Sequence, residues 1–554
     1  MIPKPLSKDI YVHSVLNQIS RILGLLDRDV SSPTYGCFDR QHWNYAISDI
    51  AQARKQESVL TLMLLYKLNI PQNPYFKNQQ IKNWIISALE FWSHIQQKDG
   101  SFNDLYPHEG SFVATAFSSY AISETLLEAQ DQFDIDDIII THLEKAALWL
   151  KGKQQHLVRN QDCGSIALFY NLYLLTKKDE FKKWAYDKFA IIIKDQNEEG
   201  WLNEYGSADI GYLSVAIDYI SKYYKKSADD TAYKFLKKAI NFIQYFVHPN
   251  STFGGHYGSR NTAYLLPHGF EFLSATMSEA RTIAYSIRES LLKKSSIDPS
   301  SLDDKYLLFM SYTYLQAYID GKDDLTITQS LYDQDINKLF TQCGLIIHNS
   351  ANFYIIVNGF KGGALDIICH KNKSSITDSG IIIKNTKGRT ISSSHLCKEN
   401  NISFRDNSIS ISGPLWFVSQ PRINSLKNIL LHGFQLTIGR NPFISSIIKK
   451  MLRNILLFSG KKSSQSFSRK IMIENDKIHI IDEIENSINI AKIILGSKSS
   501  FIYGESAHYY QSSDLKLDPL YIAPHKNGNP LTKQKISITR TFDNKGCCIN
   551  HSHN

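Results

Sequence analysis

Several polar clusters in the first half of the sequence contain side chains that can transfer protons and bind sugars. The densest runs from Gly254 to Glu271 and combines histidine, tyrosine, arginine, asparagine and glutamate. Others run from Asn203 to Asp209, from Asn103 to Glu109 and from Arg159 to Asp162. Cleavage of a 4-linked uronic acid by β-elimination needs a group that neutralises the carboxylate, a base for the C5 proton and an acid for the leaving oxygen. The clusters supply all three kinds of group.

Two sets of candidate site residues follow from these clusters. The candidates for catalysis are Tyr257, His256, His268, Asn261, Tyr264 and Tyr205. The candidates for substrate binding are Arg260, Asn203, Glu204, Asp209, Tyr106, His108, Glu109, Asn160, Trp201 and Glu271. The carboxylates in the second set leave hydrolysis open, since a hydrolase uses two carboxyl groups about 5–5.5 Å or 6.5–9.5 Å apart.

Each cluster also has a purely structural interpretation. His268 could hydrogen-bond the backbone at a helix start, and Asp209 could cap a helix. Arg260 could pair with Glu271 or Asp209 inside the scaffold, and the tyrosines could be packing residues. Both interpretations stay open at the level of sequence.

A recurring loop indicates how the clusters are positioned. Polar segments with glycine and an aromatic or large apolar residue recur at 99–102, 199–202 and 251–254, and each is followed by a tyrosine. Weaker copies lie at 35–39 and 159–162. With them, the spacing follows steps of roughly 40 to 60 residues, about the length of a helical hairpin with its loops. Stacked hairpins place equivalent loops on one side, so we expect the clusters to line one trough.

The apolar pattern divides the chain into two domains. Residues from about 8 to 320 show helical spacing, for example at Ile81, Ile85 and Ala88, whereas short β-rich runs divided by turn residues dominate beyond about 340. We therefore expect a multidomain α and β protein. An N-terminal (α/α) toroid, incomplete or with six hairpins, would cover 1–325, and a C-terminal antiparallel β-sandwich would cover 326–554.

Residues 443–458 break the β pattern with an apolar stripe at helical spacing. Lys449, Lys450 and Arg453 lie on the other side of this predicted basic amphipathic helix. The helix could lie on anionic lipid, or it could pack on one of the two domains.

Composition limits the partners and the compartment. The net charge of +9 is dispersed and accompanies no groove-reading motif, so we expect no nucleic acid; an acidic polysaccharide or oligosaccharide, or an anionic membrane, fits better. The seven cysteines include no CxxC pair, and the start of the chain lacks an apolar signal core. We expect a cytoplasmic protein, peripheral at the inner membrane if 443–458 binds lipid.

The pattern resembles the heparinase II/III-like superfamily of polysaccharide lyases, in particular a bacterial branch associated with surface polysaccharide production. The resemblance rests on 38–45, 257–262, 267–271 and 359–365. It implies an alginate-lyase-like toroid followed by an antiparallel β domain. It also implies Asn203 or Asn261 as the neutralising group, with His256 or His268 and Tyr205, Tyr257 or Tyr264 transferring protons.

The sequence departs from this family at the start of the β domain. Secreted members often carry a His-x-His-x-Asp-like stretch with ligands for a structural metal, whereas this chain has Lys361 to Asp366 without histidine. His370, Asp378 and His395 have a spacing that is only weakly typical of a metal site. We therefore predict no metal and no cofactor.

Together these features predict a carbohydrate-active enzyme. It would cleave or edit an acidic, uronate-containing polysaccharide by β-elimination, in connection with capsule or exopolysaccharide production. A glycoside hydrolase with paired carboxylates is one alternative. A non-catalytic polysaccharide-binding or assembly factor is the other.

Overall fold

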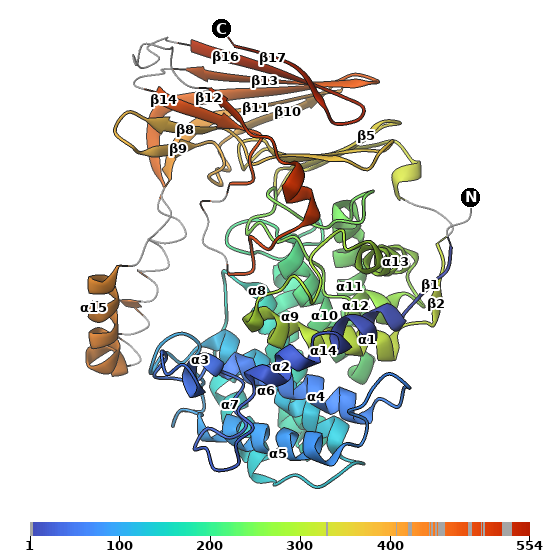
Figure 1. The fold of residues 1–554 in the computed structure, drawn as a ribbon, viewed down its shortest axis with the longest axis vertical. Helices are drawn as coiled ribbons and strands as arrows, with labels where there is room; N and C mark the ends of the chain where they lie inside the picture. Colours follow the sequence, from blue (N-terminus) through green and yellow to red (C-terminus); the bar gives the residue numbers. More distant parts are fainter. Residues whose placement is uncertain are drawn as a thin grey trace.

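The N-terminal part forms a closed ring of helical hairpins (Figure 1). The computed structural model describes residues 4–553 apart from 328–330, 406, 419–423, 442–443, 445–446, 449–450, 452–459, 486–489, 500, 502–504 and 523–534. Each inner helix contacts the next, and the last contacts the first. The inner helices are α4 (Ser58–Lys67), α6 (Phe112–Ala129), α8 (Arg159–Thr176), α10 (Ile210–Ser227), α12 (His268–Leu273) and α14 (Asp304–Asp320).

An outer layer of helices packs against this inner ring, one partner to each inner helix. The outer helices are α5 (Gln79–His94), α7 (Ile138–Lys151), α9 (Asp179–Asp195), α11 (Asp230–Ile243), α13 (Ser278–Lys293) and, beside α14, α1 (Asp9–Leu16). The ring also includes the short helices α2 (Ile19–Leu25), α3 (Arg40–Trp43) and η1 (Ala53–Glu57). The expected (α/α) toroid is therefore confirmed as a closed ring.

The sequence explains the two layers. Outer helix α11 buries Phe235, Leu236, Ala239 and Ile240. These residues lie on one face of the helix, as expected when the opposite face is in water. Inner helix α6 buries residues all round because it has neighbours on both sides and an outer helix behind it. The first and last parts of the toroid also meet in a small sheet, in which β1 (Leu6–Ser7) pairs with β2 (Asp324–Leu325).

A five-stranded antiparallel sheet lies against one end of the toroid. Its side chains alternate between two cores: Ile346 and Ile355 pack toward the second sheet, whereas Ile347 and Ile356 belong to the toroid core. Because both faces of the central strands at 345–349, 353–358 and 364–369 are buried, these strands are mostly apolar. The strands, in order across the sheet, are β3 (Ile336–Phe340), β4 (Leu345–Asn349), β5 (Phe353–Asn358), β6 (Ala364–Cys369) and β7 (Ser375–Asp378).

A larger antiparallel sheet covers the outer face of the first and completes the expected β-sandwich. Arg469, Asp482, Arg540 and Asp378 form a buried ion-pair network that joins the two sheets. The strands in spatial order are β15 (Leu520–Ile522), β14 (Ile490–Leu495), β8 (Ile382–Asn385), β9 (Thr390–Ser392), β11 (Ser408–Val418), β12 (Lys461–Ile473), β13 (Lys477–Glu485), β16 (Lys535–Asp543) and β17 (Cys548–His553), with β10 (Asn401–Arg405) on β11.

One helix in the β part was not expected. Helix α15 (Ser425–Leu436) lies in the connection between β11 and β12. The amphipathic helix expected at 443–458 falls mostly outside the described residues. Among the helices that are described, none has the length and apolarity needed to cross a bilayer.

Candidate functional site

The polar loops converge on the rim of the toroid that faces the sandwich. The backbone N–H of Arg159 donates to the carbonyl of Asn203, and that of Ser259 donates to the carbonyl of Ala208. On the sandwich side, Asn358 donates its side-chain amide to the carbonyl of Tyr257 at 2.6 Å. The loops therefore line one rim, as the repeat pattern predicted.

A small cavity of about 80 Å³, here called the mouth cavity, opens among the inner helices at this rim. Asn160, Tyr212, Tyr264 and Tyr306 contribute to its lining. Arg54 lies 3.8 Å from the ring centre of Phe309, also in the lining. Aromatic walls with a few polar groups are typical of pockets that bind small molecules.

Segment 505–517 of the sandwich, here called the strap, contacts two tyrosines, Tyr212 and Tyr306, that line the mouth cavity. It follows β14 and descends to the toroid (Figure 1). Ser506 donates a hydrogen bond to the Tyr212 hydroxyl at 3.0 Å, and Glu505 pairs with Lys305 at 2.8 Å. The Tyr509 ring packs on Tyr306 with 5.7 Å between centroids. The strap therefore places a sandwich hydroxyl group beside toroid phenols.

Two tyrosines at the mouth have raised pKa values, so both phenols hold their protons near neutral pH. Burial raises the pKa of both Tyr212 and Tyr264, while the charge of Arg260 lowers the pKa of Tyr212. A hydrogen bond with Ser506 offsets only a small part of the rise in each pKa. The two phenols therefore share one polar partner and differ in their exposure to a cation.

Two buried carboxyl groups bind the backbone of Asn160 and of Arg260, the residues whose side chains carry an amide and a guanidinium group near these phenols. Glu204 accepts a hydrogen bond from the backbone N–H of Asn160 at 2.9 Å, and burial raises the pKa of Glu204. Asp209 caps α10 and accepts from the backbone N–H of Arg260 at 2.8 Å. The Arg260 guanidinium lies 4.2 Å from the ring centre of Tyr205. Asp209 therefore has the capping role that the sequence left open.

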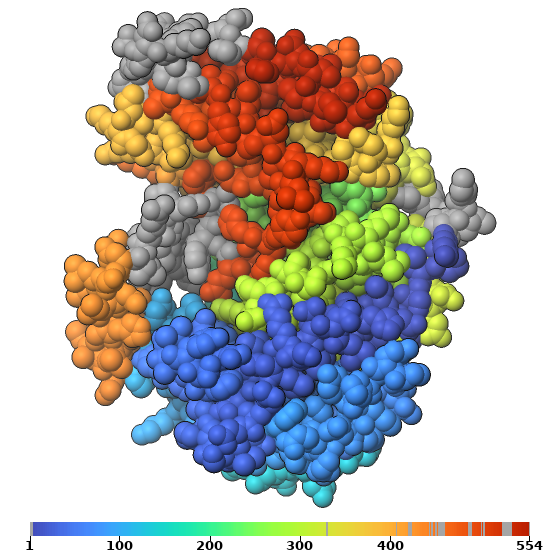
Figure 2. Space-filling view, in the orientation of Figure 1, coloured from blue at the N-terminus to red at the C-terminus, as the bar shows by residue number. Residues whose placement is uncertain are grey.

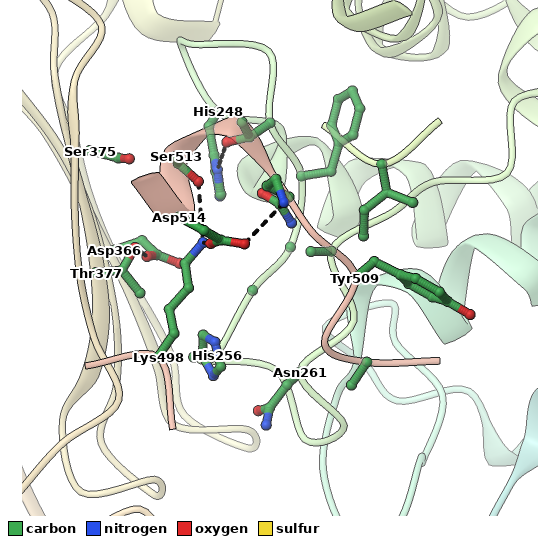
Figure 3. Close-up of a pocket in the computed structure, with 18 of the residues that line it drawn as sticks. His248, His256, Asn261, Asp366, Ser375, Thr377, Lys498, Tyr509, Ser513 and Asp514 are labelled. Carbon is green, nitrogen blue, oxygen red and sulfur yellow. Dashed lines mark hydrogen bonds and ion pairs between the residues drawn. The ribbon is translucent and has the colours of Figure 1, made fainter. Parts of the chain in front are cut away.

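A second cavity of about 280 Å³, the interdomain cavity, lies between the toroid, the small sheet and the strap (Figure 3). Lys498 reaches across it to Asp514 at 2.5 Å. Burial raises the pKa of Asp366 to about 7 and lowers the pKa of His256 to about 3. Within the described residues, His256 Nδ1 has no hydrogen-bond partner. This polar cavity adjoins the strap and extends the candidate site.

Three predicted site residues instead belong to the framework and line neither cavity. The Tyr257 hydroxyl is bonded to His248 Nε2 at 2.8 Å. His268 lies between Asp218 and Asp320, and Glu271 is paired with Arg288. Their polar atoms are held by buried neighbours, which contradicts a direct role of these side chains on substrate.

The remaining predicted residues shape the loops. Asn261 has a φ of 60° and accepts from Lys361 at 2.5 Å, at the edge of the interdomain cavity. Asn203 closes a turn by accepting from the Gly206 N–H.

Glu109 accepts from the N–H groups of Asp104, Leu105 and Tyr106. The buried Trp201 donates to Glu199, and His108 lies exposed on the same loop as Glu109.

Sequence reasoning missed other residues around the mouth. Tyr212 lies one helical turn after a cluster that was recognised, so its position held a usable signal. Arg54 and Glu57 come from the short η1 segment and carry no motif. Ser506 reaches the site only through the folding of the strap.

The comparisons identify the fold. No protein-family model and no curated protein matches the sequence. The structure of chondroitin AC lyase from Streptomyces coelicolor A3 in complex with chondroitin sulphate aligns with a TM-score of 0.53 and 8% identity, over 88% of this chain and 67% of that chain. A mutant of that enzyme gives a TM-score of 0.50, also at 8% identity over 88% of this chain and 67% of that one.

This chain has a polysaccharide-lyase fold. The (α/α) toroid followed by an antiparallel β-sandwich, which the family resemblance implied, is confirmed. A xanthan lyase from Paenibacillus aligns with a TM-score of 0.49 and 10% identity, over 96% of this chain and 56% of that chain.

Proposed function

We propose that the chain cleaves an acidic, uronate-containing polysaccharide by β-elimination at the mouth cavity. The supporting observation is the convergence of the Asn160 amide with the phenols of Tyr212 and Tyr264, beside Arg260, at one rim. These groups provide the neutralising, basic and acidic functions that the reaction requires. The shared lyase fold agrees with this proposal.

The proposed chemistry assigns one role to each group. Asn160 and Arg260 bind the uronate carboxylate and stabilise the charge that develops when C5 loses its proton. Tyr212 takes the C5 proton in its phenolate form, which the charge of Arg260 favours against the burial that raises the pKa of this phenol. The C4–O bond then breaks, a C4=C5 double bond forms, and the leaving oxygen takes a proton from Tyr264. Transfer of a proton from Tyr212 back to Tyr264 completes the cycle.

A panel of uronate polysaccharides incubated with the purified protein tests this proposal. β-Elimination gives a product with a new ultraviolet absorbance and fragments whose summed mass equals that of the polymer. Hydrolysis gives fragments heavier by one water for each cut and no new absorbance. Products of the second kind would overturn the elimination chemistry.

Two buried carboxyl groups that influence each other electrostatically, Glu57 and Asp104, favour hydrolysis as the second candidate. Burial raises the pKa of Glu57 to about 7 and that of Asp104 to about 6. A carboxyl group that keeps its proton near neutral pH can act as a general acid. If hydrolytic products form, Asp104→Asn should remove the activity, whereas β-elimination does not depend on this carboxyl group.

We further propose a place for the activity in capsule or exopolysaccharide production in a bacterium, with the protein on the cytoplasmic side of the membrane. A non-catalytic binding or assembly role is the remaining alternative. Its sign would be a polymer-dependent rise in melting temperature without any product.

A further inference from the structure

Helix α15 presents large aliphatic side chains to solvent. It stands at the edge of the molecule, beside the N-terminal part of the toroid (Figures 1 and 2). The exposed fractions of Leu426, Ile429 and Leu430 are 65%, 68% and 64%. Soluble proteins rarely expose a contiguous group of such side chains unless the group binds something.

These aliphatic residues form one stripe of an amphipathic helix. Leu426, Ile429 and Leu430 are spaced by three and four residues, so they share a face. Leu436 extends this stripe, whereas Gln435 is buried on another side of the helix. The exposed face is therefore apolar, and a polar residue is turned inward.

A toroid loop adds apolar side chains near the helix. His432 of α15 lies 3.9 Å from Asp49, on a loop that also carries Tyr45 and Ile47. Tyr45 is 57% exposed and Ile47 is 74% exposed. We call α15 together with 45–49 the apolar edge. Two separate parts of the fold contribute to it.

The sequence around α15 carries positive charge without any negative charge. Between Ser425 and Lys462 there is no aspartate or glutamate. Lys427 lies on α15, Arg440 follows it, and Lys461 and Lys462 are exposed at the start of β12. Such a segment attracts an anionic surface and repels a second copy of itself.

We propose that the apolar edge binds the anionic surface of a lipid bilayer. Its exposed aliphatic side chains would lie at the boundary between headgroups and acyl chains, with the lysine and arginine residues at the anionic headgroups. A lipid surface accepts aliphatic side chains without shaped pockets, and its anionic headgroups complement the lysine and arginine residues, while Asp49 of the edge lies beside His432. This inference is independent of the proposed catalytic activity.

Flotation with lipid vesicles tests the proposal. The intact protein should float with vesicles of phosphatidylcholine and phosphatidylglycerol and remain unbound with phosphatidylcholine alone. Raising the salt concentration should weaken binding, because screening reduces the attraction between charges. The triple variant Leu426→Ser/Ile429→Ser/Leu430→Ser should lower the partition coefficient roughly tenfold or more, since each side chain loses apolar area.

A matched variant separates this surface from general surface apolarity. Leu148 on α7 and Leu292 on α13 are 64% and 56% exposed, and Leu148→Ser/Leu292→Ser should leave vesicle binding unchanged. Equal loss in both variants, binding to phosphatidylcholine alone, or no binding by the intact protein would overturn the proposal. A dimer of the intact protein that the α15 variant dissociates would assign the surface to a second copy instead. Unchanged melting temperatures show that the variants are folded.

Discussion

At the scale of single residues, two buried tyrosines illustrate how contacts separate a candidate catalyst from a framework residue. The Tyr212 hydroxyl accepts a hydrogen bond from Ser506 beside the mouth cavity, and Arg260 influences its pKa. The Tyr257 hydroxyl is bonded to His248 inside the core. The sequence analysis placed Tyr257 in the site because it lies in a polar, glycine-containing loop. Local sequence does not distinguish such a tyrosine from one that faces a cavity.

Phenylalanine substitutions distinguish these two roles. Tyr212→Phe should reduce kcat/KM for β-elimination by about 100-fold or more, because the proton-transfer group is lost. Tyr257→Phe leaves His248 Nε2 without its partner and should reduce the free energy of unfolding by about 1–3 kcal/mol. Its kcat/KM should stay close to that of the unmodified protein. Initial rates and urea unfolding of both variants provide the measurement; a larger rate loss for Tyr257→Phe would reverse the assignment.

Local sequence could not decide which side chains of a cluster reach a cavity. Asn160 and Tyr264 were predicted correctly to lie at the rim. His268 was predicted beside them, but its ring nitrogens contact Asp218 on α10 and Asp320 on α14. Motif composition was the same in both cases, and the difference depends on contacts with distant helices. Ser506 could not be found at all, since only tertiary folding brings it to Tyr212.

At the scale of elements, the glycines of the recurring loops have a common structural reason. Gly36, Gly100 and Gly200 all have positive φ angles. A Cβ on each would approach a carbonyl oxygen within 2.2–2.4 Å, and these oxygens belong to outer helices α5, α7 and α11. Only glycine, which lacks a Cβ, lets each loop pack this closely against the backbone of the neighbouring outer helix. The recurrence was visible in sequence, but this close approach was not.

Alanine substitutions test this packing requirement. Gly200→Ala should destabilise the protein by on the order of 2–4 kcal/mol, since the Cβ would meet the Lys238 carbonyl at 2.3 Å with a φ of 106°. Gly152→Ala is the matched control, because its Cβ meets nothing within 4 Å and its φ is −87°. That change should alter the free energy of unfolding by about 0.5 kcal/mol or less. Similar effects of both substitutions in urea unfolding would refute the explanation.

At the scale of the whole molecule, Lys361 joins the two domains. Its ammonium group donates to the carbonyls of His256 and Gly258 and to the Asn261 side chain. Burial lowers the pKa of Lys361 to about 7. Lys361 therefore holds the toroid loop against the sandwich by hydrogen bonds.

The Lys361 pKa gives a pH dependence with a defined sign. Between pH 7 and about 10 the unfolded chain binds a proton at this residue that the folded protein has lost, so rising pH favours the folded state. The unmodified protein should gain roughly 2–4 kcal/mol over this range relative to Lys361→Met. Urea unfolding at several pH values measures the difference. A difference that does not change with pH would show that Lys361 remains charged.

The pairing of β1 with β2, and of α1 with α13 and α14, also constrains biosynthesis. A ribosome releases α1 long before it has translated the helices on which α1 packs. At about 5–20 residues per second, this delay lasts roughly 15–60 s. During that time the apolar side chains Tyr11, Val12 and Val15, which the finished protein buries, have no native partner. The nascent chain is therefore a natural client for a chaperone that shields its first helix.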